Sequence, residues 1–194
     1  MMNDTLEITR KWAMPNSRTF TIKPIKEFVE KYIAGANIII DPFANECKYG
    51  TITNDLNPEY DTNYHLDALD FLKQLPSDYA DIILYDPPYS LRQVTEHYKG
   101  FGINVTQEKT QSSWRARHLD EITRILKPGG LCLCFGWNSA GCGKKRGFEM
   151  IEILLVAHGG SKNDTICTAE KKSLTNKTAV LHDTTPQGND KGVK

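Results

Sequence analysis

Four residues that can bind a flat amine follow an apolar run in the middle of the sequence. Asp86, Pro87, Pro88 and Tyr89 come directly after residues 82–85. A strand that meets two prolines cannot extend its hydrogen-bond ladder or enter a helix, so the loop is held rigid and extended. The Asp86 carboxylate and the Pro87 carbonyl can accept hydrogen bonds from an exocyclic NH2 group, and the Tyr89 ring offers a stacking face. This combination predicts a nucleobase ligand.

The tetrapeptide resembles the DPPY signature of the amino-methyltransferases that use S-adenosylmethionine (SAM), most closely the small bacterial or phage type of adenine-N6 DNA methyltransferase. The resemblance spans roughly residues 20–169. It implies that Asp86, Pro87, Pro88 and Tyr89 are the catalytic residues. A proline-rich turn after any buried strand is the alternative for the tetrapeptide taken alone.

Three further segments resemble the SAM-binding motifs of this family. Residues 20–24 precede a predicted helix and contain Thr21 and Lys23, which can face the methionine carboxylate. Residues 41–44 resemble the DPF motif beside the methionine part of SAM, and residues 67–68 match the position beside the adenine ring. The resemblance therefore implies cofactor binding by Thr21, Lys23, Asp41, Pro42, Phe43, Ala44, Asp55, Asp67, Ala68 and Asp86.

Local structure offers an alternative role for three of these residues. Asp55 ends a predicted strand, where ligands bind in open α/β sheets and where a carboxylate can accept from two ribose hydroxyls. Residues 54–58 are also rich in turn formers, so Asp55 can instead be a turn residue. Asp67 can be a helix cap, and Lys23 can be a solvated lysine at a helix start. For Asp55 we favour binding.

The loop after the DPF-like motif departs from the family pattern. The chain has Ala44, Asn45, Glu46 and Cys47 where the family usually has a small residue, Gly, any residue and Gly. Asn45 tolerates left-handed backbone, but Cys47 adds a side chain where space is expected to be tight. Residues 41–55 are also too short for the usual helix between two parallel strands, so we expect a compact loop and a SAM pocket that is either rebuilt or weakened.

Apolar strand-like runs alternate with amphipathic helical stretches, as in βαβ units on a mostly parallel sheet. The expected last pair of strands is antiparallel, with a tight turn at His158, Gly159 and Gly160. This layout predicts an α/β, Rossmann-like SAM-dependent methyltransferase fold: a mostly parallel sheet with a C-terminal antiparallel hairpin. The predicted helices are 25–34, 66–75 and 114–126, with a break at 127–130, and the predicted strands are 37–41, 51–55, 81–86, 131–137, 150–157 and 165–169.

Composition indicates an ordinary globular chain. Its 194 residues are 39% hydrophobic and 25% charged, with zero net charge. We expect one domain over residues 1–170 and a flexible polar tail over residues 171–194. The sequence contains neither an apolar run long enough to cross a bilayer nor an N-terminal secretion signal, which predicts a cytoplasmic protein without membrane contact.

The five cysteines form no CxxC pair. Cys132 and Cys134 alternate within an apolar strand-like run, where they can pack as small hydrophobic residues. The sequence therefore predicts neither a disulfide nor a metal site.

Two basic, loop-like segments can contact nucleic acid: residues 90–113, a possible substrate-recognition loop, and residues 141–147. Cations and aromatic rings in such loops suit phosphates and unstacked bases. Solvated surface loops, and a structural tryptophan at position 137, are alternatives of similar weight. The candidate substrate-binding residues are Ser90, Arg92, Trp137, Asn138, Lys144, Lys145 and Arg146.

The leading hypothesis is a DNA adenine-N6 methyltransferase that transfers a methyl group from SAM to a flipped adenine. DNA is the expected partner, with RNA as the alternative. The chain has no room for a separate recognition domain, so we expect a homodimer or a partner subunit. The open alternatives are an RNA or other nucleobase amino-methyltransferase, and a catalytically weak subunit that binds nucleic acid.

Overall fold

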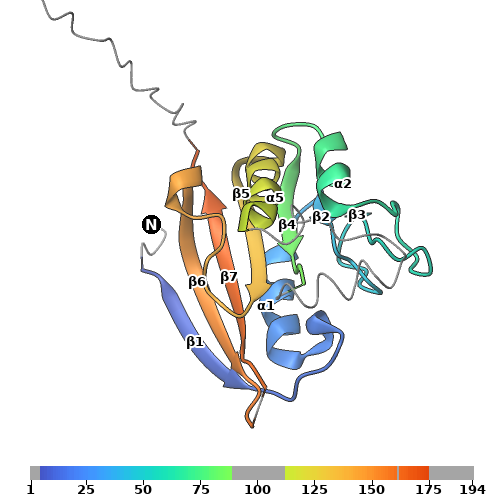
Figure 1. Ribbon diagram of the computed structural model, residues 1–194. Coiled ribbons are helices and arrows are strands. Elements are labelled where there is room, and N and C mark those ends of the chain that lie inside the picture. Colours follow the sequence, from blue (N-terminus) through green and yellow to red (C-terminus); the bar gives the residue numbers. More distant parts are fainter. Residues whose placement is uncertain (1–4, 89–111, 161, 175–194) are drawn as a thin grey trace, which may run out of the picture.

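The computed structural model describes residues 5–88, 112–160 and 162–174. Within these residues seven strands form one mixed sheet in the order β1-β6-β7-β5-β4-β2-β3 (Figure 1). Tyr89, Ser90, Arg92 and most of the possible recognition loop lie outside the described residues. The strands are β1 (Glu7–Trp12), β2 (Ile39–Asp41), β3 (Ile52–Thr53), β4 (Ala80–Tyr85), β5 (Leu126–Gly136), β6 (Phe148–Ala157) and β7 (Thr165–Lys172).

The sheet confirms the predicted fold class. Strand β7 pairs antiparallel with both β5 and β6, and the other neighbouring strands pair parallel. The predicted tight turn between β6 and β7 is wrong, because residues 158–164 separate the two strands. His158 holds this longer connection in place, since its ring contacts the carbonyl of Ala13 and the hydroxyl of Thr165, both at 2.8 Å.

Helices cover both faces of the sheet around two apolar clusters (Figure 1). Helix α1 (Lys23–Ile33) buries Ile25, Phe28 and Val29 against one face, at the spacing of a single helical stripe. Helices α2 (Ala68–Gln74) and α5 (Ser112–Ile125) pack together on the other face. The short 3-10 helices η1 (Thr19–Thr21) and η2 (Lys144–Arg146) complete these elements.

Strand β1 and the start of strand β5 differ from the elements that the hydrophobic pattern predicts. Strand β1 was not predicted because nearly all of its side chains are exposed. It pairs with β6 and is tied to α1 by ion pairs from Glu7 to Lys31 and from Lys11 to Glu27. Strand β5 begins directly after α5, five residues earlier than expected, because residues 127–130 bulge from the strand instead of ending the helix in a loop.

No helix in the described parts of the chain is long and apolar enough to span a bilayer.

A buried polar pair links the sheet to α5 beside the carboxyl end of β4. The hydroxyl of Tyr85 lies 3.1 Å from Nδ1 of His118, and both side chains are fully buried. Burial lowers the pKa of His118 to about 4, an effect that nearby Arg117 and Arg115 reinforce and Asp67 opposes. His118 is therefore neutral in the folded protein at pH 7.

This depressed pKa makes stability depend on pH. In the unfolded chain the histidine takes up a proton below pH 6.5, whereas in the folded chain it stays neutral down to about pH 4. The stabilisation is therefore fully present above pH 6.5 and is lost as the pH falls toward 4. We expect His118→Gln to remove about 2 kcal/mol of the stability difference between pH 7 and pH 5. Urea unfolding measures this difference, and the exposed-site variant His65→Gln should behave as wild type; equal pH profiles for all three proteins would contradict the assignment.

Candidate functional site

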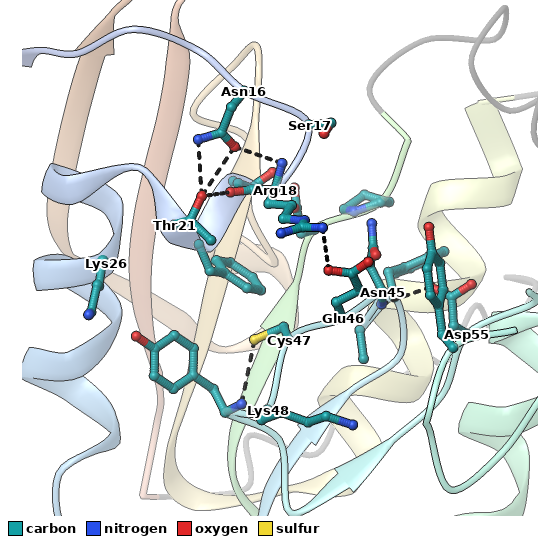
Figure 2. Close-up of a pocket in the computed structure, with 18 of the residues that line it drawn as sticks. Asn16, Ser17, Arg18, Thr21, Lys26, Asn45, Glu46, Cys47, Lys48 and Asp55 are labelled. Atoms are coloured by element: carbon teal, nitrogen blue, oxygen red, sulfur yellow. Dashed lines mark hydrogen bonds and ion pairs between the residues drawn. The ribbon is translucent and has the colours of Figure 1, made fainter.

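A large cavity lies where the order of the strands reverses. The chain passes from β2 to β3 on one side and then returns to place β4 on the other side of β2. The loops that follow these parallel strands leave the same edge of the sheet, and ligands of open α/β sheets bind at such a switch point. The cavity has a volume of about 790 Å3. It is lined by residues 16–21, Lys26, residues 43–49, Asp55, Tyr60 and residues 86–88 (Figure 2).

The loop after β2 forms the floor of this cavity without glycine at the two family positions. Asn45 adopts a left-handed backbone with φ of 50°, as its side chain allows. The backbone N–H of Cys47 donates to the carbonyl of Ala44 (2.8 Å), which closes the turn. The Cys47 side chain is half-buried, and its sulfur accepts a hydrogen bond from the backbone N–H of Tyr49 (3.5 Å). The expected compact loop is confirmed, and an open cavity remains beside it.

Asp55 supports this loop and also lines the cavity. Its two carboxylate oxygens accept backbone hydrogen bonds from Asn45 and Asn57, each at 2.9 Å. Each carboxylate oxygen has a second lone pair, so Asp55 can still accept from a ligand hydroxyl. The turn role and the binding role, which the sequence set against each other, are therefore compatible.

Asp41 lies beneath the loop and does not line the cavity. It is fully buried, and its Oδ1 accepts a hydrogen bond from the backbone N–H of Phe43 (3.1 Å). Within the described residues its Oδ2 has no hydrogen-bond partner. Burial raises the pKa of Asp41, and the negative charges of Asp86 and Asp55 raise it further. Three acidic side chains thus meet at one edge of the sheet.

The segment before α1 forms the opposite wall. The amide of Asn16 donates to the hydroxyl of Thr21 (3.0 Å), and that hydroxyl donates to the carbonyl of Arg18 (2.8 Å). Arg18 reaches across the mouth to Glu46 with an ion pair of 2.7 Å (Figure 2). Both side chains of this pair are at least half exposed, so the contact contributes little free energy and can open to admit a ligand.

The predicted catalytic loop forms a third side of the cavity. Asp86, Pro87 and Pro88 follow β4 directly and all line the cavity. The structure thus brings these residues together with Thr21, Phe43, Ala44 and Asp55.

Other predicted cofactor residues lie outside the cavity wall. Lys23 is exposed at the start of α1, whereas Lys26, one turn later, lines the cavity. Asp67 caps α2, since its carboxylate accepts a hydrogen bond from the backbone N–H of Leu69 (3.0 Å). Pro42 and Ala68 line a second, much smaller cavity beside Phe43. Capping is thus one role of Asp67.

The predicted substrate-binding residues after β5 also lie apart from the cavity wall. Trp137 and Asn138 are exposed, and the Asn138 side chain accepts a hydrogen bond from the backbone N–H of Ala140 (3.0 Å). Lys144 and Lys145 are exposed on η2. Arg146 forms an ion pair with Asp120 on α5 (2.7 Å), which gives it a structural role.

Several lining residues were missed from the sequence. Tyr49 packs edge-to-face against Phe20, with ring centroids 6.3 Å apart. Residues 16–19, a polar run shortly before Lys23 and Pro24, were a usable signal for part of this wall. Most of the other missed residues lie in irregular loops, where no periodic pattern marks them. The missed residues are Asn16, Ser17, Arg18, Thr19, Phe20, Lys26, Lys48, Tyr49 and Tyr60.

No protein-family model matches the sequence. The chain is similar to the Type II methyltransferase M.BamHI of Bacillus amyloliquefaciens, with 33% identity over 82 residues, which are 39% of this chain and 18% of that enzyme. The match therefore spans less than a fifth of the curated relative.

Solved structures agree over most of the chain. A SAM-dependent methyltransferase from Archaeoglobus fulgidus matches with a TM-score of 0.55 at 13% identity, covering 81% of this chain and 95% of that one. The Burkholderia thailandensis 1,6-didemethyltoxoflavin-N1-methyltransferase, solved with S-adenosylhomocysteine, matches with a TM-score of 0.53 at 11% identity, covering 78% and 77%. The chain therefore has the Rossmann-like fold of SAM-dependent methyltransferases.

The left-handed backbone of Asn45 leads to a prediction about the cavity floor. Asn45→Gly should leave the free energy of unfolding within about 1 kcal/mol of wild type, because glycine adopts positive φ freely. Asn45→Val should destabilise by about 1–3 kcal/mol, because a branched side chain is strained there. Urea unfolding of both variants measures the difference. Equal stability of the glycine and valine variants would mean that the loop does not hold this conformation.

Proposed function

We propose that the protein is a SAM-dependent methyltransferase that acts on the exocyclic N6 amine of adenine in DNA. The observation that carries this proposal is the meeting of Asp86, Pro87 and Pro88 with Asp55 and the loop after β2 around one cavity. The fold and the similarity to a Type II methyltransferase support the same reaction class. The resemblance of residues 86–89 to the DPPY signature supports adenine in DNA as the target.

The cavity fits SAM in size and in chemical character. Its volume of about 790 Å3 is within the usual range of small-molecule sites. Asp55 can hold the ribose hydroxyls, and the wall that contains Thr21 lies across from it to receive the methionine part. Phe20 and Tyr49 add an aromatic surface to that wall. Asp86 then stands at the end of β4, where the reacting groups meet.

When bound, SAM supplies an activated methyl group, so the protein needs no strong base. The Asp86 carboxylate and the Pro87 carbonyl accept hydrogen bonds from the target NH2 group, which directs the nitrogen lone pair toward the methyl carbon. As the N–C bond forms and the C–S bond breaks, the Asp86 carboxylate stabilises the positive charge that develops on nitrogen. The nitrogen then loses one proton to Asp86 or to water, and S-adenosylhomocysteine leaves.

Target binding requires a base outside the DNA stack. Extrusion costs a few kcal/mol, which stacking on an aromatic side chain offsets in part. In this proposal Tyr89 supplies that ring, and the exposed Trp137, Lys144 and Lys145 contact the flanking nucleic acid. A second copy or a partner subunit then extends the contact surface, and the cytoplasm is the expected location.

The first prediction of the proposed function concerns cofactor binding. Isothermal titration of wild type with SAM and with S-adenosylhomocysteine should give micromolar dissociation constants. Asp55→Asn should weaken both about tenfold, because it removes a charge at the ribose position and replaces one of the two oxygens that accept from the backbone of Asn45 and Asn57. The control Asp70→Asn changes an exposed carboxylate on α2 and should bind as wild type. No binding by wild type, with or without DNA, would overturn the SAM site.

Methyl transfer is the second prediction. Asp86→Asn should lower the transfer of labelled methyl groups to DNA at least about 100-fold, because the developing charge on nitrogen loses its anionic partner. The variant should keep the wild-type circular dichroism spectrum, and Asp70→Asn should keep wild-type activity. Activity above half of wild type in Asp86→Asn would remove Asp86 from the mechanism.

Mass spectrometry of the modified nucleosides decides the substrate. N6-methyladenine in DNA is the expected product. A different methylated base in DNA, or methylation of RNA alone, would replace the adenine-N6 DNA assignment with the alternative of an RNA or other nucleobase amino-methyltransferase. SAM binding without any methyl transfer would favour the catalytically weak subunit.

A further inference from the structure

Three buried cysteines gather away from the cavity. Cys132 and Cys134 lie on β5, and Cys142 lies in the connection between β5 and β6. The three sulfur atoms lie within 4.8 Å of one another, and those of Cys132 and Cys134 are 3.4 Å apart. In the part of the chain that the structure describes, no other group of three histidine, cysteine or acidic side chains comes this close.

The spacing of the sulfur atoms matches a metal centre. Thiolates about 2.3 Å from one metal ion in a trigonal arrangement lie about 4.0 Å from one another. The sulfur atoms of Cys132 and Cys134 are somewhat closer than this, at 3.4 Å, and all three sulfur atoms lie within 4.8 Å of one another, so small shifts would bring them to this spacing. We propose that Cys132, Cys134 and Cys142 form a three-thiolate site for a thiophilic cation, Zn²⁺ or Cu⁺.

Backbone register explains how the strand presents two of the ligands. Cys132 and Cys134 are two residues apart on β5, so their side chains project from the same face of the sheet. Their partners on the antiparallel strand β7 are Glu170 and Thr168. Neighbouring polar groups therefore come from β7 at the same register.

Glu170 positions the third ligand. Its carboxylate accepts hydrogen bonds from the backbone N–H groups of Cys142 and Gly143. Glu170 is almost fully buried, as is Cys142. A buried carboxylate thus fixes the backbone of the loop at the point where Cys142 faces the strand, an arrangement that packing of a small apolar side chain would not require.

Thr168 also lies beside the cluster. Its side chain lies opposite Cys134 and is only 1% exposed, and its hydroxyl lies within reach of the Cys134 sulfur. A hydroxyl that donates to sulfur favours the thiolate, which is the form that binds a metal. A water molecule could complete the coordination of Zn²⁺ as its fourth ligand, whereas Cu⁺ needs only the three thiolates.

One cation near the cluster can offset part of the charge of a thiolate centre. The guanidinium of Arg115 lies over the ring of Tyr85, 5.5 Å from its centroid, and donates to the carbonyl of Ala140 in the same loop as Cys142. Metal binding would release the thiol protons to solvent. With three thiolates the centre carries a net charge of −1 for Zn²⁺ and −2 for Cu⁺, which Arg115 offsets in part and the buried carboxyl group of Glu170 opposes when it is ionised.

A metal bound at this site would hold the loop after β5 in place. Residues 137–147 contain Trp137, Lys144 and Lys145, the exposed candidates for nucleic-acid contact. A metal that joins Cys142 to Cys132 and Cys134 would fix this loop on the strand beneath it. The inference depends only on the cysteine cluster and stands whether or not the protein methylates DNA.

The test is metal binding by the reduced, full-length protein without oxygen. Wild type should bind one Zn²⁺ or one Cu⁺ per chain, and the bound metal should raise the melting temperature. Co²⁺ should give thiolate-to-cobalt charge-transfer absorption that Zn²⁺ abolishes. Competition with a Cu⁺ chelator measures the affinity for Cu⁺. The cobalt experiment and the chelator experiment together show whether the site prefers Zn²⁺ or Cu⁺.

Two variants decide whether the cluster is the site. Cys142→Ser should weaken metal binding at least about 100-fold and remove the cobalt absorption, because one thiolate is lost. The control Cys167→Ser changes a fully buried cysteine that packs in the other apolar cluster, and it should bind as wild type. Absence of binding by wild type, or equal binding by Cys142→Ser, would overturn the proposal. Since Cys142 lies in a loop, Cys142→Ser tests the site even if Cys132→Ser prevents folding.

Discussion

The parallel pairing of β2 with β4 is the constraint on which the cavity depends. It consists of two residue pairs, Ile39 with Ile82 and Ile40 with Ile83. Because the two strands run in the same direction, the loops that begin at Pro42 and at Asp86 leave the same edge of the sheet. Both faces of the two strands are buried, since Ile39 and Ile82 lie in one apolar cluster and Ile40 and Ile83 in the other. The Asp81 carboxylate accepts hydrogen bonds from the backbone N–H groups of Asn37 (3.0 Å) and Ile38 (2.9 Å), and these bonds help to fix the register and thereby the two sides of the cavity.

A buried asparagine maintains the loop that lacks the family glycines. Asn54 is 1% exposed and donates its side-chain amide to the carbonyls of Pro42 (3.1 Å) and Leu66 (3.0 Å). Its side-chain oxygen accepts from the backbone N–H of Leu66 (2.9 Å), and its backbone carbonyl accepts from Ala44 (2.9 Å). This satisfied network joins the loops after β2 and β3, so the turn shape depends on buried hydrogen bonds and not on glycine.

The sequence could predict the elements whose buried residues form a regular stripe or a continuous apolar run. Helix α1 and strands β2 and β4 are such elements, and residues 86–88 could be placed because prolines end a strand. Strand β1 could not be predicted, because backbone pairing with β6 holds it without a buried face. The cavity wall at Arg18 and Glu46 also escaped, since it depends on a contact between distant irregular segments. The proximity of Cys142 to β5 depends on Glu170 of β7, a relation that no local pattern contains.

The acidic edge of the sheet favours positive charge near Asp55 and Asp86, whereas the cations Arg18, Lys26 and Lys48 line other parts of the cavity. Burial raises the pKa of Asp41, and the charges of Asp86 and Asp55 raise it further, so each added carboxylate makes the next one less favourable. A positive ligand in the cavity would relieve this repulsion. In the proposed reaction the sulfonium of SAM carries such a charge, whereas S-adenosylhomocysteine has lost it. The same carboxylates would therefore stabilise the cofactor more than the product, because the favourable attraction disappears when the methyl group is transferred.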